Sequence, residues 1–130
     1  MAMNADATLR NTWLDAIATR AGANPKIRGR TGTKPASAGA TRTGTVLVTI
    51  TLTGGFNAAS GGSMSIATPG VTGAAATTGD IGHWELVDNA GTLVVLQGDV
   101  GELLSFDTNT ITASGQVVSI SSFAITAPNA

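Results

Sequence analysis

Few residues in this 130-residue chain have side chains suited to acid–base or nucleophilic chemistry. There is one histidine, His83, and there is no cysteine or tyrosine. His83 could be combined with Asp88 or Asp99 and a serine into a triad, but no serine lies in the Gly-x-Ser-x-Gly pattern of a nucleophile elbow. The pattern places His83 on a strand beside Trp84, in a half-buried or surface position. We therefore predict that the chain is not an enzyme and has no catalytic residues.

Two turns are rich in side-chain oxygen atoms, the ligand type that Ca²⁺ prefers. One contains Asp88 and Asn89, and the other contains Asp107 and Asn109. Neither turn continues into a twelve-residue loop that ends in Glu, and Asp and Asn are common in turns because they bond to the nearby backbone. We predict no metal and no cofactor, and the sequence leaves open whether either turn binds a cation.

The charged residues, 12% of the chain, are unevenly distributed. All seven Lys and Arg residues lie in the first 42 positions, where Asp6 and Asp15 are the only acids, and the remaining six acids follow. This asymmetry favours a basic arm that contacts an acidic partner. Nucleic acid is not favoured, because the arm lacks interleaved aromatic residues and the domain behind it is acidic. The acidic half of a neighbouring copy fits as well.

An amphipathic helix is predicted near the start of the chain. Leu9, Trp13 and Ile17 recur at i, i+4 and i+8, and Leu14 and Ala16 widen this apolar stripe, which we expect to be buried. The signals for its ends are Asn4 or Asp6 as the N-cap, Gly22 as the C-cap and Asn24–Pro25 as a stop.

The basic residues that follow this helix are expected to form an arm. Lys26–Arg30 has the alternating charge that protects a short edge strand, and residues 31–35 are typical of a turn. Residues 36–44 contain no bulky apolar side chain and are predicted to be an extended arm or linker. The predicted division is an N-terminal helix and basic arm over residues 1–42 and one further domain over residues 43–130.

The pattern from residue 43 onward predicts a mainly β domain. Apolar residues alternate with threonine and serine, and about seven short strands are separated by Gly-containing turns, which is typical of an antiparallel β-sandwich or jelly-roll-like fold. The predicted parts are strands at 46–53 and 63–67, a loop at 68–80, a hairpin of 81–87 and 92–97 with its turn at 88–91, one or two strands in 103–112, and a strand at 116–126 with a β-bulge at Ser121–Ser122.

Membrane insertion is not expected. The longest apolar run, Leu93–Leu96, is far too short to span a bilayer, and the first residues lack the charged and apolar regions of a secretory signal.

Five stretches of the sequence carry a resemblance to a known class of proteins: Ala7–Ile17, Thr31–Pro35, Gly82–Gly91, Gln97–Gly101 and Val117–Pro128. They resemble small virion structural proteins of tailed bacteriophages and prophages, most closely a head decoration, or cement, protein. The resemblance implies a β-sandwich or jelly roll on the outer surface of the capsid that bridges major capsid protein subunits, often as a dimer or trimer, with no catalytic residues.

Two alternatives stay open. Some decoration proteins begin with an extended arm alone, so the predicted helix is also compatible with a tail, baseplate or neck subunit of the virion. A carbohydrate-binding host-recognition module is the second alternative, although five aromatic residues leave few for stacking on sugar rings. The predicted partners are the major capsid protein and further copies of the chain, and the residues predicted to contact them are Arg10, Trp13, Arg28, Arg30, Lys34 and Arg42.

Overall fold

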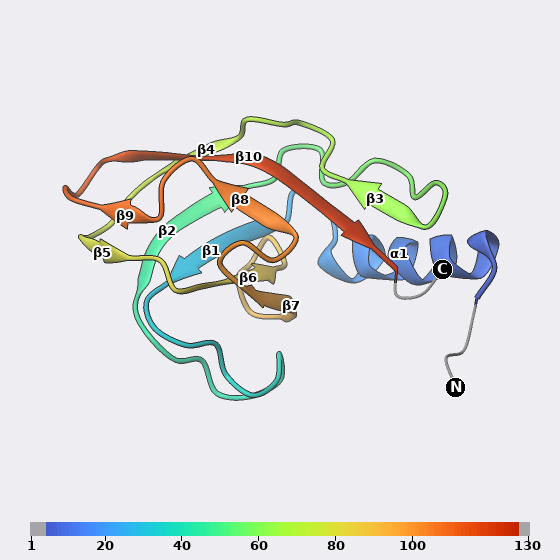
Figure 1. Cartoon of the computed structure of the whole chain (residues 1–130), viewed down its shortest axis with the longest axis horizontal. Coiled ribbons are helices and arrows are strands. Elements are labelled where there is room, and N and C mark those ends of the chain that lie inside the picture. The colour runs from blue at the N-terminus through green and yellow to red at the C-terminus, as the bar shows by residue number, and fades with distance from the viewer. Residues whose placement is uncertain (1–4, 128–130) are drawn as a thin grey trace.

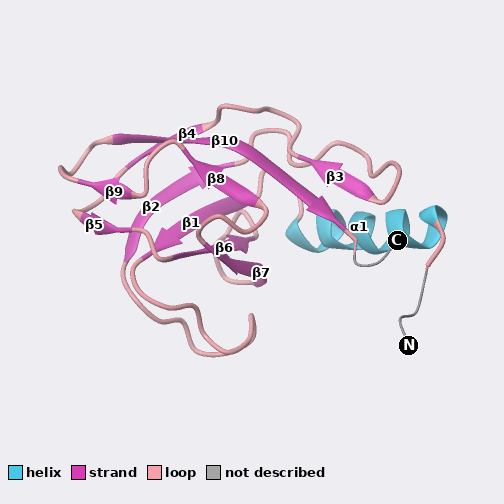
Figure 2. Cartoon of the chain, in the orientation of Figure 1, coloured by secondary structure: helices cyan, strands magenta, loops and turns pink. Residues whose placement is uncertain are grey.

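The computed structural model describes residues 5–127, which form one helix and a set of short antiparallel strands (Figure 1). This confirms the mainly β character and the N-terminal helix that the sequence predicts. Figure 2 shows the helix at one end of the molecule and the strands filling the rest. The elements are α1 (Ala7–Ala21), β1 (Lys26–Arg30), β2 (Val46–Thr51), β3 (Ser63–Ser65), β4 (Thr72–Ala74), β5 (Gly79–Asp80), β6 (His83–Val87), β7 (Val94–Asp99), β8 (Leu104–Phe106), β9 (Thr110–Ile111) and β10 (Val117–Thr126).

One antiparallel sheet has the strand order β2-β1-β6-β7. β1 is therefore an interior strand, and the prediction that Lys26–Arg30 forms an edge strand is wrong. The alternation in β1 buries Ile27 and Gly29 on one face and places the cationic side chains on the other. On that second face Arg28 lies opposite Glu85 of β6 in the strand register. The alternating cations of β1 therefore face an acidic residue of the neighbouring strand β6. The local sequence does not reveal this pairing.

The other strands gather around β10, which pairs with β3, β4 and β8, while β5 pairs with β9. The register of β10 against β8 shifts between Ile120 and Ser122, so the predicted β-bulge is confirmed. The predicted loop at 68–80 is wrong, because β4 and β5 lie within it. A Cβ atom on Gly73 would overlap the Thr49 carbonyl oxygen of β2. Small residues that suggest flexibility in the sequence allow this close approach of two strands.

Aromatic packing joins the two groups of strands. Trp84 of β6 is fully buried and meets Phe123 of β10 edge to face, with the ring centroids 5.3 Å apart. The indole Nε1 of Trp84 donates to the carbonyl oxygens of Asp99 and Glu102, both at 3.1 Å. Gly98 is the residue opposite Trp84 on β7, and a Cβ atom there would lie 2.6 Å from the indole ring. The core therefore depends on the absence of a side chain at Gly98.

The ends of α1 are set by local capping. The Asp6 side chain accepts a hydrogen bond from the Leu9 amide at 2.7 Å, and the Gly22 amide donates to the Ala18 carbonyl at 3.0 Å. Asp6 is thus confirmed as the N-cap and Gly22 as the C-cap, whereas Asn4 lies outside the described residues. Within those residues, no helix has the length and apolar character needed to cross a membrane.

The face of α1 that packs on the strands differs from the predicted one. Leu14 and Ala21 are buried and Ile17 is half-buried, whereas Leu9 is 45% and Trp13 is 43% exposed. The prediction that Leu9 and Trp13 belong to the buried stripe is therefore wrong. Leu9 and Leu14 are about 140° apart around a helix of 3.6 residues per turn. α1 thus carries apolar residues on two faces, and only the Leu14 face packs against the rest of the chain.

The contact between Gly98 and Trp84 gives a first prediction. Gly98→Ala should lower the free energy of unfolding by about 1–3 kcal/mol, because the added methyl group overlaps a fully buried ring. Chemical denaturation monitored by tryptophan fluorescence measures this loss. Gly39→Ala is the matched control, because a Cβ atom there meets nothing within 4 Å. Equal stabilities of the two variants would contradict the packing role of Gly98.

Candidate functional site

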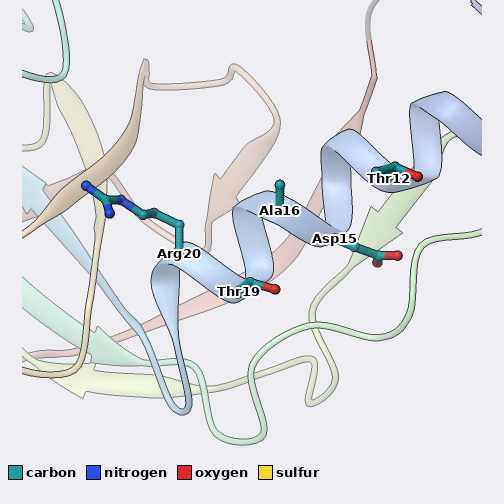
Figure 3. A pocket seen from close by; sticks show the side chains of 5 residues that line it. All are labelled: Thr12, Asp15, Ala16, Thr19 and Arg20. Carbon is teal, nitrogen blue, oxygen red and sulfur yellow. The ribbon is translucent and has the colours of Figure 1, made fainter.

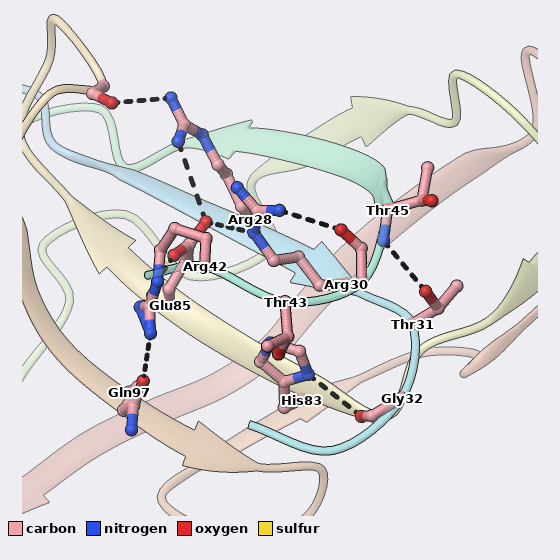
Figure 4. A network of polar contacts seen from close by, with 12 residues as sticks. Arg28, Arg30, Thr31, Gly32, Arg42, Thr43, Thr45, His83, Glu85 and Gln97 are labelled. Atoms are coloured by element: carbon pink, nitrogen blue, oxygen red, sulfur yellow. Dashed lines mark hydrogen bonds and ion pairs between the residues drawn. The ribbon is translucent and has the colours of Figure 1, made fainter. Parts of the chain in front are cut away.

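Three of the residues predicted to contact partners converge on one carboxylate, that of Glu85 (Figure 4). Glu85 lies on β6 and is fully buried. The Nε of Arg30 donates to Oε1, and a terminal nitrogen of Arg42 donates to Oε2 at 3.1 Å. A terminal nitrogen of Arg28 lies 3.7 Å from Oε1. Because an unpaired buried carboxylate is strongly destabilising, these three cations are what allow Glu85 to be buried.

The same guanidinium groups also tie neighbouring segments to the sheet. Their other N–H groups donate to main-chain carbonyl oxygens of the segment between β1 and β2 and of the β6–β7 turn. One of them donates to the side chain of Gln97 on β7. We name residues 31–45 the β1–β2 connection. The bonds are Arg28 to the Gly91 carbonyl (3.0 Å), Arg30 to the Gly44 carbonyl (3.2 Å), and Arg42 to Gln97 Oε1 (2.7 Å) and the Ser37 carbonyl (3.4 Å).

The β1–β2 connection is held against the sheet by further polar contacts. Lys34 forms an ion pair with Asp99 at 2.9 Å, and the Gln97 amide donates to the carbonyl of the buried Pro35 at 2.7 Å. The hydrogen bond to Asp99 raises the pKa of Lys34 above its ordinary value. The segment predicted as an extended arm therefore folds back onto the strands of its own chain.

His83 lies beneath the β1–β2 connection and is fully buried, so the prediction of a half-buried or surface position is wrong. Its Nδ1 lies 3.0 Å from the Gly32 carbonyl oxygen, which fits the tautomer protonated at Nδ1. Its Nε2 is buried and has no hydrogen-bond partner within the described residues. Residues far away in the sequence cover this histidine, which explains why the strand pattern alone did not predict its burial.

The basic first part of the chain thus finds acidic partners in the second part. Arg28, Arg30 and Arg42 pair with Glu85, and Lys34 lies near both Asp99 and Glu102. The charge asymmetry of the sequence corresponds in large part to complementarity within one molecule. The sequence analysis missed Glu85 as the centre of this cluster. The sequence does show that Arg28 and Arg30 are two residues apart and so lie on one face of a strand. Only the register of β1 against β6 shows that Glu85 lies on the same face.

The oxygen-rich turns are built from side-chain bonds to the backbone. Oδ1 of Asp88 accepts from the Thr92 and Leu93 amides at 2.9 and 3.2 Å, and Oδ1 of Asp107 accepts from the Ser119 amide at 2.9 Å. The bonds to Asp88, above all the one from the Leu93 amide, lower the pKa of Asp88 below its ordinary value. Across residues 5–127, no three His, Cys, Asp or Glu side chains are grouped closely enough to hold a metal ion.

Arg10 is engaged within the chain as well. Its side chain is half-buried and lies against the buried Gly62, and its terminal nitrogen is 3.5 Å from the Ala127 carbonyl. The Gly62 amide donates to the side chain of Asn11 at 2.8 Å. These contacts join α1 to the turn before β3 and to the end of β10, and leave Arg10 little freedom to reach another molecule.

Trp13 is the member of the predicted contact set with the most exposed side chain, at 43%. It lies on an exposed face of α1, about 100° around the helix from the buried Leu14, together with the exposed Leu9, Ala16 and Arg20. We name these four residues the α1 outer stripe. A hollow runs along this side of the helix, and Figure 3 shows Ala16 and Arg20 beside it. The residues lining the hollow are Thr12, Asp15, Ala16, Thr19 and Arg20.

Comparisons with known proteins return no match: no family model, no curated protein and no solved structure resembles the chain significantly.

The buried carboxylate gives a second prediction. Glu85→Gln should lower the free energy of unfolding by about 3–5 kcal/mol, because it leaves three neighbouring guanidinium groups without their counter-charge. Asp80→Asn, at an exposed carboxylate of β5, is the matched control and should stay within about 0.5 kcal/mol of the parent. Urea denaturation measures both, and a Glu85→Gln variant as stable as the control would contradict the role of the cluster.

The turn at Asp88 gives a third prediction, on pH. In the folded state the pKa of Asp88 is below its ordinary value of 3.8. The stabilisation that the ionised Asp88 provides is therefore complete above pH 3.8. It should be lost as the pH falls through the lowered pKa of the folded state. An NMR titration of the Asp88 carboxyl carbon, with the Thr92 and Leu93 amides as reporters, measures this shift. A midpoint at or above the ordinary value would contradict the hydrogen bonds described.

Proposed function

We propose that the chain is a structural protein of a bacteriophage virion, a decoration or cement protein that binds the outer surface of the head. It would stabilise the contacts between major capsid protein subunits. The resemblance of several stretches of the sequence to small virion proteins supports this proposal. The observation that carries it is the α1 outer stripe, which suits contact with a further copy of the chain in a repetitive assembly, because Leu9 and Trp13 are exposed on a helix whose other face already completes the core. Exposed aromatic and arginine residues are the usual anchors of protein interfaces.

The internal pairing of charges also supports a structural role. The arginines around Glu85 and the lysine beside Asp99 hold the β1–β2 connection against the strands. We name residues 26–126, which contain all the strands, the β body; because these cations are paired internally, its surface is rich in threonine, alanine and glycine. In this proposal the body is a sandwich or jelly-roll-like unit that covers a seam between capsid subunits. A contact of Arg28, Arg30, Lys34 and Arg42 with a partner remains a prediction, and their positions give them first a role in shaping the surface.

The mechanism in this proposal is mechanical. A shell made of many identical subunits opens where neighbouring subunits separate, and each bound copy adds an interface that must also break. An interface of about 1,600 Å² can contribute several kcal/mol even after the entropy cost of association. Because the sites repeat around the shell, copies that contact two subunits at once gain further strength from multivalent attachment. No bond is made or broken, so the proposal requires no catalytic group.

A binding experiment with purified heads tests this function and gives a fourth prediction. Heads that lack the protein are mixed with the full chain, sedimented and then heated while DNA release is followed. We expect the chain to sediment with the heads at a fixed ratio to the major capsid protein and to raise the temperature of DNA release. Denatured major capsid protein, which no longer forms the shell lattice, serves as the control. A chain that stays in the supernatant would contradict the proposal.

The helix also favours a second candidate, a tail, baseplate or neck subunit of the virion. α1 has a confirmed cap and a packed face, unlike the extended N-terminal arm of some decoration proteins. A ring-forming tail subunit would assemble into closed rings in solution, whereas a cement protein requires the shell for higher assembly. Electron microscopy of the purified chain at high concentration distinguishes the two, because rings of uniform diameter would favour the tail or neck.

A further inference from the structure

We propose that the α1 outer stripe binds the same stripe of a second copy, so that two α1 helices pair in an antiparallel, two-fold arrangement. Leu9, Trp13, Ala16 and Arg20 are four, three and four residues apart. This alternation of four and three residues is that of the contact seam of a coiled coil. All four residues are exposed within one molecule. α1 therefore presents a packing seam that its own chain leaves uncovered.

The stripe is complementary to itself when the second helix runs in the opposite direction. In an antiparallel pair centred between residues 14 and 15, Trp13 of each copy lies opposite Ala16 of the other, and Leu9 lies opposite Arg20. The largest side chain of the seam thus meets the smallest, at the hollow that Ala16 helps to line. Packing of large against small residues is how facing helices fill the space between them. The two-fold axis thus places the indole of each copy in the hollow of the other.

Electrostatics favour the same arrangement. Antiparallel helices place the N-terminal end of one dipole beside the C-terminal end of the other. Arg20 would cover Leu9 of the second copy with its aliphatic stem and bring its guanidinium within about 4.5 Å, along the helix axis, of the level of Asp6. The positions that flank the seam are Arg10, Thr12, Ile17 and Thr19, and the one charged residue among them, Arg10, is half-buried against Gly62 of its own chain.

Asp15 also lines the hollow but is directed to its own chain. Its Oδ1 accepts a hydrogen bond from the Ala59 amide at 3.4 Å. This contact keeps the carboxylate at the border of the hollow, away from the seam formed by Trp13 and Ala16. The side of the hollow next to the seam is formed by the small Ala16, which leaves room for an indole of the second copy.

This inference rests on the proposed function for its role on the particle. The seam spans only three turns of helix, so the interface belongs to the small, weak class in solution. A paired unit would present two β bodies, and each body could attach to a separate capsid subunit. The weak helix contact would then be strengthened by the high local concentration of copies on the shell.

Variants of the full chain test the surface and give a fifth prediction. Analytical ultracentrifugation of the parent should show a reversible dimer, and Trp13→Ala should weaken dimerisation at least tenfold. Ala16→Leu should have the same effect, because it fills the hollow without removing an apolar side chain. Val117→Ala removes an exposed apolar side chain from β10 and should leave the dimer unchanged. Circular dichroism and thermal unfolding of each variant verify that it is folded.

Disulfide trapping tests the orientation, since the natural chain has no cysteine. Antiparallel pairing predicts that Thr12→Cys and Thr19→Cys chains, mixed and oxidised, form the mixed disulfide in preference to either symmetric one. A parallel pair would instead bring equivalent seam residues together, so a Leu9→Cys chain would form its symmetric disulfide; antiparallel pairing keeps the two Leu9 positions about 16 Å apart along the axis, and that disulfide would overturn the arrangement.

The outcomes separate this inference from the proposed function. A chain that is monomeric at every concentration and binds heads equally well with Trp13→Ala would overturn the pairing but leave the decoration role. A dimer that is lost with both Trp13→Ala and Ala16→Leu, yet never binds heads, would support the pairing and contradict the decoration role.

Discussion

The position of one buried carboxylate determines much of this structure. Glu85 has no exposure to solvent, and a carboxylate in that position is tolerated only if cations surround it. Two of those cations come from β1 and the third, Arg42, comes from the β1–β2 connection. The pairing therefore fixes β1 next to β6 and holds a segment that has almost no apolar anchor of its own. Among the described residues, Glu85 is the only carboxylate that pairs with these three guanidinium groups and opposes their mutual repulsion.

The features that the sequence predicts correctly are those with a local signal. The helix has a capping aspartate and a terminal glycine, the hairpin at 88–91 has the turn residues that such a loop requires, and the bulge at Ser121–Ser122 appears as a break in an alternating pattern. The errors all concern contacts between distant segments. The cations of β1 suggested an edge strand because their partner Glu85 is far away in the sequence, 55 residues beyond Arg30. His83 and the strands within 68–80 were missed for the same reason, since burial and pairing there depend on segments that local periodicity does not report.

The candidate site shows how a sequence pattern can carry two meanings. Charge asymmetry indicated an arm that meets an acidic partner, and the acidic partner is found within the same chain for Arg28, Arg30, Lys34 and Arg42. The apolar residues of α1 indicated one buried stripe, and they form two. The Leu14 face completes the core, whereas the Trp13 face remains exposed. The exposed stripe of α1, and not the charged segment, is therefore the surface that we propose for contact with neighbouring copies.

The proposed role as a phage decoration protein is tested most directly by electron cryomicroscopy of an intact particle that carries this chain, at side-chain resolution. The proposed role predicts density for the chain on the outer surface of the head, above junctions of the major capsid protein, with α1 helices of neighbouring copies crossing in opposite directions at Trp13. A particle whose outer head surface lacks the chain, or one in which the Trp13 face of α1 points into solvent at every site, would contradict it.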